Sequence, residues 1–169
     1  MAAIDLSKAE RTILANQYKI LSIIDPDNLA EYNNNMEILE LGYVGFYPQI
    51  VKCEAEISYE VYKETHRILT MFRDINVSKQ ALVKAEGDRF NALTFVGFDG
   101  NHDPHYHLAK FMVEKQNLYE ELRDADLNSH SQASIESYRR MEHVYQKLNK
   151  KNGILDANGL QQLLDVMNP

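Results

Sequence analysis

The stretch Leu93-Thr94-Phe95-Val96-Gly97-Phe98-Asp99-Gly100-Asn101 interrupts a chain whose other segments have the periodicity of amphipathic helices. It places four large apolar residues beside two glycines. A segment this apolar is expected inside the protein, and Gly97 and Gly100 allow backbone turns that other residues disfavour. We interpret it as a buried joint between two helical halves.

The length and composition are typical of a small globular protein. The 169 residues suit one domain, predicted to span residues 1–169. Cys53 is the only cysteine, so no intrachain disulfide is possible, which fits a reducing compartment. We expect a cytoplasmic protein, because no apolar run approaches the roughly 18 residues of a membrane span and the first residues do not resemble a signal peptide. The net charge of −7 disfavours binding to nucleic acid or to anionic membranes.

Local signals mark the helices before the joint. The capping box Ser7-Lys8-Ala9-Glu10 predicts a helix that Asp25-Pro26 ends. A second helix is expected from Pro26 to Leu41, with Gly42 as its stop. Ser58 is expected to cap a third helix that runs to about Ile75, followed by a short helix that Ser78 opens.

After the joint, Asp103-Pro104 predicts a helix over about residues 104–122. A polar loop is expected over 124–134, then a helix over 134–148 and a last short helix capped by Asp156. The chain is therefore predicted to be all-α, a single-domain bundle of about seven helices with a short irregular, glycine-containing central segment.

Two polar residues fall among apolar neighbours on these helices. Gln17 lies near the centre of the apolar face of the first helix, so its amide is expected to be buried and hydrogen-bonded. Glu64 projects into the apolar arc of the third helix, and we expect it to reach water at the helix edge. The aromatic segment 42–48 is interpreted as core packing, with a surface between subunits as the alternative.

The residues resemble those of the YfbU family over nearly the whole chain. The resemblance rests on several motifs, namely Ala9-Glu10-Arg11, Leu14-Ala15-Asn16-Gln17-Tyr18-Lys19-Ile20-Leu21 with Asp25-Pro26, Ile38-Leu39-Glu40-Leu41-Gly42-Tyr43, Ile68-Leu69-Thr70-Met71-Phe72-Arg73, Phe95-Val96-Gly97-Phe98-Asp99-Gly100-Asn101 with Phe111 and Met112, Asn128-Ser129-His130, and Tyr138-Arg139-Arg140-Met141. The resemblance implies a small, cytosolic, mainly helical bacterial protein, and it implies no activity and no catalytic residues.

The cluster of His102, Asp103, His105 and His107 has the residue types of a transition-metal site. If Pro104 opens a helix, His105 and His107 point about 200° apart around its axis and cannot share one ion. We therefore expect histidines exposed at a helix start, with no bound metal and no cofactor.

Asp99, Asn101 and His130, with Arg139 or Arg140, form the candidate polar site of an enzyme at the joint. An antiparallel pairing of helices 104–122 and 134–148 would put Asp99 and His130 at opposite ends, roughly 25–30 Å apart at 1.5 Å per residue. We therefore expect that the two side chains of one chain do not share a pocket.

Three functions remain open. The first is a non-enzymatic interaction or regulatory protein that acts as a homo-oligomer, and the second is an enzyme with a polar site near the Gly97–Asn101 joint and the Asn128–His130 loop. The third is binding of nucleic acid, an acidic protein or another anionic ligand by the basic face of the 134–148 helix, which carries Arg139, Arg140, His143 and Lys147 and is followed by Lys150 and Lys151. The alternative for this face is a solvated helix surface.

Overall fold

The computed structural model of the chain describes residues 4–52, 56–130, 135–148 and 153–167. Its contacts divide into two compact units, Met1–Ala55 and Glu56–Pro169, and each is described by itself. The described parts hold α-helices joined by short 3-10 and π turns and no β-strand, which confirms the all-α prediction. Cys53 and the lysines at 150 and 151 lie outside the described residues.

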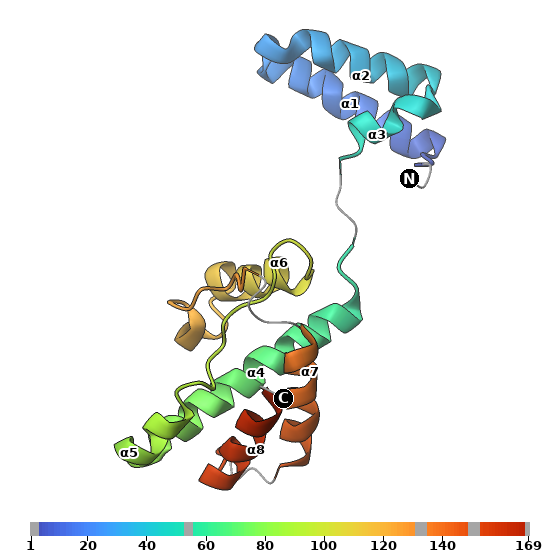
Figure 1. The fold of residues 1–169 in the computed structure, drawn as a ribbon. Coiled ribbons are helices and arrows are strands. Elements are labelled where there is room, and N and C mark those ends of the chain that lie inside the picture. Colours follow the sequence, from blue (N-terminus) through green and yellow to red (C-terminus); the bar gives the residue numbers. More distant parts are fainter. Residues whose placement is uncertain (1–3, 53–55, 131–134, 149–152, 168–169) are drawn as a thin grey trace. The chain divides into compact units, whose positions relative to one another are not determined.

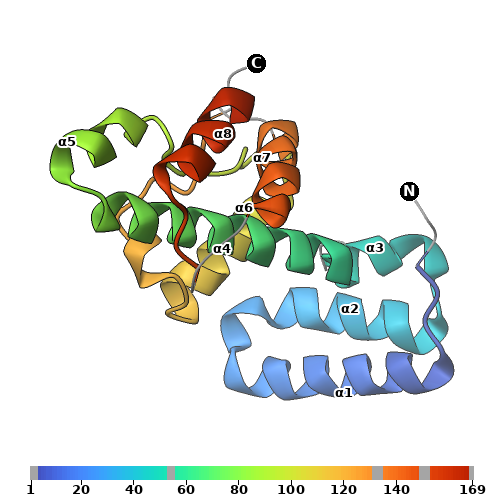
Figure 2. The same ribbon diagram turned by 90° about the horizontal axis from the view of Figure 1, so that it is seen from below.

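The first unit is a hairpin of two antiparallel helices, α1 (Lys8–Ile24) and α2 (Leu29–Leu41), which lie side by side in both views (Figures 1 and 2). A 3-10 turn (Pro26–Asn28) joins them. The predicted capping box is present, because the backbone N–H of Ser7 donates to Glu10 Oε2 at 2.8 Å and that of Glu10 donates to Ser7 Oγ at 3.3 Å. Gly42 ends α2 in the left-handed conformation, φ +74°, as predicted.

A short segment completes the first unit. A 3-10 turn (Val44–Phe46) leads into the four-residue α3 (Tyr47–Ile50). Of the three aromatics in the 42–48 segment, Tyr47 is buried, whereas Tyr43 and Phe46 are about half exposed. The segment therefore contributes both to the interior and to the surface of its unit.

The second unit is built on α4 (Tyr59–Ala81). The short helix α6 (His105–Lys110) lies on one side of α4, and α7 (Ile135–Lys147) packs on another side with α8 (Ala157–Met167) beside it (Figures 1 and 2). The four-residue α5 (Lys84–Gly87) and a 3-10 turn (Asp88–Phe90) follow the end of α4 and lead into the joint.

The joint is buried, as predicted, but in an extended form that turns alternate side chains outward. Leu93, Phe95 and Phe98 are each at most 3% exposed, whereas Thr94 and Val96 face outward. Val96 is 41% exposed, so its expected burial was wrong, and the period of two in an extended chain explains why. The buried rings form a cluster with centroids 5.2–5.8 Å apart, made of Phe72, Phe95, Phe98 and Tyr138.

The predicted helix start at Ser78 was wrong, because α4 continues without a break to Ala81. Ser78 is fully buried, and its hydroxyl donates to the carbonyl of Asp74 one turn earlier. The same hydroxyl accepts a hydrogen bond of 2.8 Å from the backbone N–H of Leu155. Ser78 therefore ties α4 to the segment before α8 instead of capping a new helix.

The predicted helix over residues 104–122 was also wrong in its second half. It ends as a π turn (Phe111–Lys115), and Asn117 and Tyr119 then adopt positive φ angles of 52° and 56°. The reversal buries Tyr119 against α4, where its hydroxyl lies 2.7 Å from His66 Nδ1 and donates to the His66 carbonyl. The buried ring and these bonds hold a backbone conformation that non-glycine residues rarely adopt.

Candidate functional site

The loop Asn128–His130 lies directly against the joint, in contrast to the predicted separation of 25–30 Å. Phe98 and Asn128 form an isolated parallel β-bridge. The backbone N–H of Phe98 donates to the Leu127 carbonyl at 3.0 Å, and that of Ser129 donates to the Phe98 carbonyl at 2.9 Å. The separation was wrong because it assumed an unbroken helix over 104–122, whereas the chain turns back after Lys115.

Gly97 makes this close approach possible. Its φ is +88°, and a Cβ at this position would lie 2.5 Å from the carbonyl carbon and oxygen of Leu127. The side chain of Asn128 completes the connection, because its Oδ1 accepts from the backbone N–H groups of Gly100 and His130 at 3.2 and 3.0 Å. One amide oxygen thus joins the two segments of the candidate site.

Asp99 and Asn101 belong to one tight turn before α6. Asp99 is buried, and its Oδ1 accepts from the backbone N–H of Asn101 at 2.9 Å. The other oxygen, Oδ2, lies 2.9 Å from His102 Nδ1, while the Asp99 backbone N–H donates to Asp103 Oδ2 at 3.1 Å. The Asp99 carboxylate is therefore engaged in fixing the turn.

His130 lies at the surface of the same region, with φ +47° and Nε2 3.7 Å from Asp126 Oδ2. It lines a pocket of about 290 Å³ with Thr94, Val96 and Asn128, to which Asp99 does not contribute. The neighbouring hydroxyl of Ser129 is buried, and it has no hydrogen-bond partner within the described part of the chain. The structure thus brings His130 to the joint but gives Asp99 and His130 different surroundings.

A second polar cluster in this unit centres on Glu64. Arg139 Nε and Nη2 donate to its two oxygens at 2.7 and 2.9 Å, and Arg139 Nη1 donates to Glu136 at 2.5 Å. His105 Nε2 lies 2.9 Å from Glu64 Oε2 and donates, because an ionised carboxylate only accepts. Glu64 keeps 18% of its side chain exposed, but residues from α6 and α7 bind its carboxylate, which the sequence expectation did not include.

These donors set the protonation of the site. The hydrogen bonds from Arg139, with a smaller contribution from His105, lower the pKa of Glu64 from 4.5 to about 2, although burial acts in the opposite direction. The same contacts raise the pKa of Arg139 above its usual value. The carboxylate is thus fixed in its ionised form, and it is poorly suited to exchange protons near neutral pH.

The histidine cluster separates as the helix geometry predicts. His105 is buried under the ring of Phe98, at a centroid distance of 5.4 Å, whereas His102 and His107 are exposed. The expectation of an exposed His105 was wrong. Its ring is buried between Phe98 and Glu64 of α4, and neither contact can be deduced from the helix that carries His105. Among the described residues, no three histidine, cysteine or acidic side chains are arranged to hold a metal ion.

The predicted basic face of α7 is partly engaged within the unit. Arg139 binds the two glutamates, and Arg140 Nε donates to the Val166 carbonyl near the end of α8 at 3.4 Å. Lys147 Nζ lies 2.7 Å from His143 Nε2 on the same helix. The positive charge available to an anionic partner is therefore smaller than the sequence suggested.

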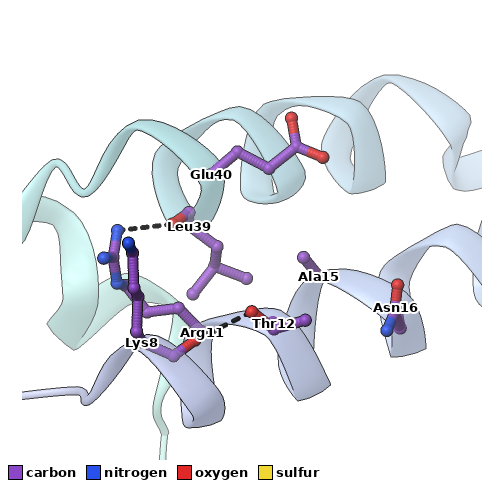
Figure 3. Close-up of a pocket in the computed structure, with 7 residues that line it drawn as sticks. All are labelled: Lys8, Arg11, Thr12, Ala15, Asn16, Leu39 and Glu40. Atoms are coloured by element: carbon purple, nitrogen blue, oxygen red, sulfur yellow. Dashed lines mark hydrogen bonds between the residues drawn. The ribbon is translucent and has the colours of Figure 1, made fainter.

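The first unit has a small polar pocket of about 260 Å³ between α1 and α2 (Figure 3). Arg11 extends from α1 toward the end of α2, where its Nη1 donates to the Leu39 carbonyl at 3.1 Å. A cation at the C-terminal end of a helix offsets the partial negative charge there. We therefore assign Arg11 a structural role in the hairpin.

The apolar face of α1 is the least expected feature of the structure. Ile13, Ile20 and Ile24 are 57%, 59% and 69% exposed, and Gln17 between them is exposed too. The predicted burial of Gln17 was wrong within this unit, because α2 packs on the side of α1 that carries Arg11 and Ala15. We call Ile13, Gln17, Ile20 and Ile24 the α1 stripe.

An apolar groove of about 510 Å³ adjoins the α1 stripe at Ile13. Leu6, Leu14, Ile50 and Val51 provide its apolar wall, and Glu10 and Lys52 also line it. By contrast, the unit buries few apolar side chains, and the described ones are Ala15, Leu39 and Tyr47. Soluble proteins rarely leave a continuous apolar face of this kind uncovered.

These features define a small all-α protein whose polar clusters hold its helices together and whose first helix presents an apolar face. The chain belongs to the YfbU family, since the family model of the YfbU domain matches residues 4–166. It is 29% identical over 178 aligned positions to UPF0304 protein MJECS11 of the archaeon Methanocaldococcus jannaschii, an alignment that covers 96% of this chain and 99% of that protein. None of the described helices combines the length and the apolarity needed to cross a membrane.

Proposed function

We propose that this chain is a non-enzymatic interaction protein that acts as a homo-oligomer in the cytoplasm, and that its first unit provides the contact. The observation that carries the proposal is the exposed α1 stripe on a unit with a very small interior. About 50 residues in two helices and a short turn bury too little apolar surface for independent stability. Association with another chain would bury the stripe and stabilise the hairpin.

The polar residues of the second unit support the same proposal. Asp99 fixes the turn before α6, Asn128 joins two backbone segments, and Arg139 connects α7 to α4. Each of these groups has a structural task in the folded unit. Of the other candidates, Asn101 donates its backbone N–H within the Asp99 turn, and Arg140 donates to the Val166 carbonyl. His130 lines a pocket of about 290 Å³.

Light scattering on the full-length chain tests the proposal directly. We expect an integral multiple of the chain mass at micromolar concentration, and Ile20→Glu should shift it toward one chain. Lys19→Glu is the matched control, because Lys19 is the exposed neighbour on the same helix and lies off the stripe. A native chain that stays monomeric up to about 100 µM, well above the micromolar affinity of a weak interface, would contradict the proposal.

A second candidate is an enzyme with its site at the joint, because the structure brings the Asn128–His130 loop beside Phe98. In that case small polar metabolites should shift the amide resonances of Asn128–His130 in the labelled protein, and His130→Ala should abolish the shifts. Resonances that stay unchanged across a broad metabolite set would favour the interaction protein.

A further inference from the structure

We infer that the α1 stripe is the seam of a homodimer and that Gln17 of one copy meets Gln17 of the second copy at the two-fold axis. The inference rests on the proposed function and specifies its contact. Two α1 helices would cross at this residue, with the isoleucines of the stripe packed on both sides of it.

The spacing of the stripe is that of a helix–helix seam. Its members follow one another at intervals of four, three and four residues, which places Ile13 and Ile20 at d positions and Gln17 and Ile24 at a positions of a heptad. All four are exposed in the unit, so the seam is available to another helix. Gln17 is also one residue from the midpoint of α1 (Lys8–Ile24), so helices that cross there overlap along most of their length.

The side-chain amide of Gln17 indicates which partner covers the α1 stripe. An apolar partner helix would bury the Gln17 amide without hydrogen bonds, at a cost of about 1–3 kcal/mol. A second copy supplies the same amide at the same place, because a residue on a two-fold axis meets itself. An amide has both a donor and an acceptor, so two identical amides satisfy each other.

The positions that flank the seam fit an identical partner. At the e and g positions beside Gln17 and Ile20 the chain has Leu14, Asn16, Leu21 and Ile23, none of which is charged. Two copies can therefore approach without repulsion between like charges. A partner of different sequence and opposite charge would find no charged groups there to recognise.

The exposed apolar area is close to what a dimer needs. The four isoleucines at 13, 20, 23 and 24 leave on the order of 300 Å² of apolar surface uncovered, at about 120 Å² for a full side chain. One side of a standard interface buries about 800 Å², of which roughly 450 Å² is apolar. The adjoining groove at Leu6, Leu14, Ile50 and Val51 adds further apolar surface beside Ile13.

Disulfide trapping tests the position of the axis. The natural cysteine is first removed by Cys53→Ser, and a single cysteine is then introduced by Gln17→Cys. Mild oxidation at micromolar concentration should convert most of this protein to a covalent dimer, because the two thiols face each other. Lys19→Cys is the control, since residue 19 points about 200° away from residue 17 around the helix and should stay monomeric under the same conditions.

Gln17→Glu provides a second measurement that does not depend on oxidation. At pH 7 it should raise the dimer dissociation constant at least tenfold relative to native protein, because two carboxylates would meet at the axis. At pH 4 the ratio between variant and native protein should fall toward one as the carboxylates become protonated. Helix content by circular dichroism should be unchanged, since Gln17 is exposed in the single unit.

The outcomes separate the inference from the proposed function. A monomeric native chain overturns both. A native oligomer in which Gln17→Cys gives no more covalent dimer than Lys19→Cys, or in which Gln17→Glu leaves the dissociation constant unchanged, overturns the inference alone. Selective trapping at residue 17 together with the pH-dependent weakening supports it.

Discussion

The guanidinium of Arg139 binds both carboxylate oxygens of Glu64, with Nε 2.7 Å from Oε1 and Nη2 2.9 Å from Oε2. His105 donates to the same carboxylate, so one acidic side chain connects α4 with both α6 and α7. A bidentate pair of this kind is stronger and more directional than a single charged hydrogen bond. The Glu64 carboxylate therefore helps to hold α6 and α7 against α4.

This carboxylate should make stability depend on acid pH. Because the folded state lowers the pKa of Glu64 from 4.5 to about 2, its contribution is complete above pH 4.5 and is lost as the pH falls toward 2. We expect native protein to lose about 1–2 kcal/mol more than Glu64→Gln across this window, because Arg139 is 45% exposed and solvent screens the pair. Urea unfolding at several pH values measures the difference. Glu60→Gln is the control, since Glu60 is largely exposed and should leave the pH dependence of native protein intact.

Gly97→Ala is expected to destabilise the second unit strongly. The positive φ alone costs about 1–3 kcal/mol for a residue with a Cβ. The contact of 2.5 Å with the Leu127 carbonyl adds to this cost, because backbone on both sides must shift. Gly45→Ala is a matched control, as a Cβ there meets no atom within 4 Å and Gly45 has no positive φ. Equal unfolding midpoints for the two variants would contradict the close packing of the joint on residues 127–128.

Helix ends with local signals could be predicted from the sequence, and the reversal after α6 could not. The cap at Ser7, the stop at Gly42 and the cap at Asp156 each depend on residues within one turn, and all three are present. The reversal at Asn117 and Tyr119 uses positive φ angles without glycine, and it is held by a tyrosine that reaches α4. A local pattern does not contain that information.

The long-range contacts of the candidate site could not be predicted from local sequence pattern either. The partners of Glu64 are 41 and 75 residues away, so the sequence could show only that a carboxylate occupies an apolar arc. For Gln17 the pattern on the helix was correct, with the amide in the centre of an apolar face. The error lay in assuming that the face packs within its own unit, which periodicity cannot determine.

Asn128→Ala should loosen the contact between the loop and the joint. It removes the acceptor of two backbone N–H groups, those of Gly100 and His130, and each loss costs about 0.5–1.5 kcal/mol. Asn128→Asp retains an acceptor oxygen and should recover most of the stability. Hydrogen exchange at the two amides should accelerate in the alanine variant and much less in the aspartate variant. Unchanged exchange in both variants would mean that the side chain does not hold the loop.

Ser78→Ala is expected to weaken the attachment of α8 to the rest of the second unit. The serine hydroxyl is the acceptor for the backbone N–H of Leu155, and both groups are buried, so the variant leaves a donor without a partner at a cost of about 1–3 kcal/mol. The lost bond from Ser78 to the Asp74 carbonyl matters less, because that carbonyl lies within α4 and is available to the helix backbone.

Thr65→Val is the control for this last change. Thr65 is equally buried on α4, and its hydroxyl donates only to the Val61 carbonyl of the same helix. The valine variant therefore removes a hydroxyl without orphaning a group on another segment, and it should cost well below 1 kcal/mol, as expected for a near-isosteric exchange that leaves no unpaired buried group. Urea unfolding gives both values, and hydrogen exchange at the Leu155 amide should accelerate in Ser78→Ala alone. Similar losses in the two variants would show that burial of the hydroxyl, and not its bond to Leu155, determines the cost.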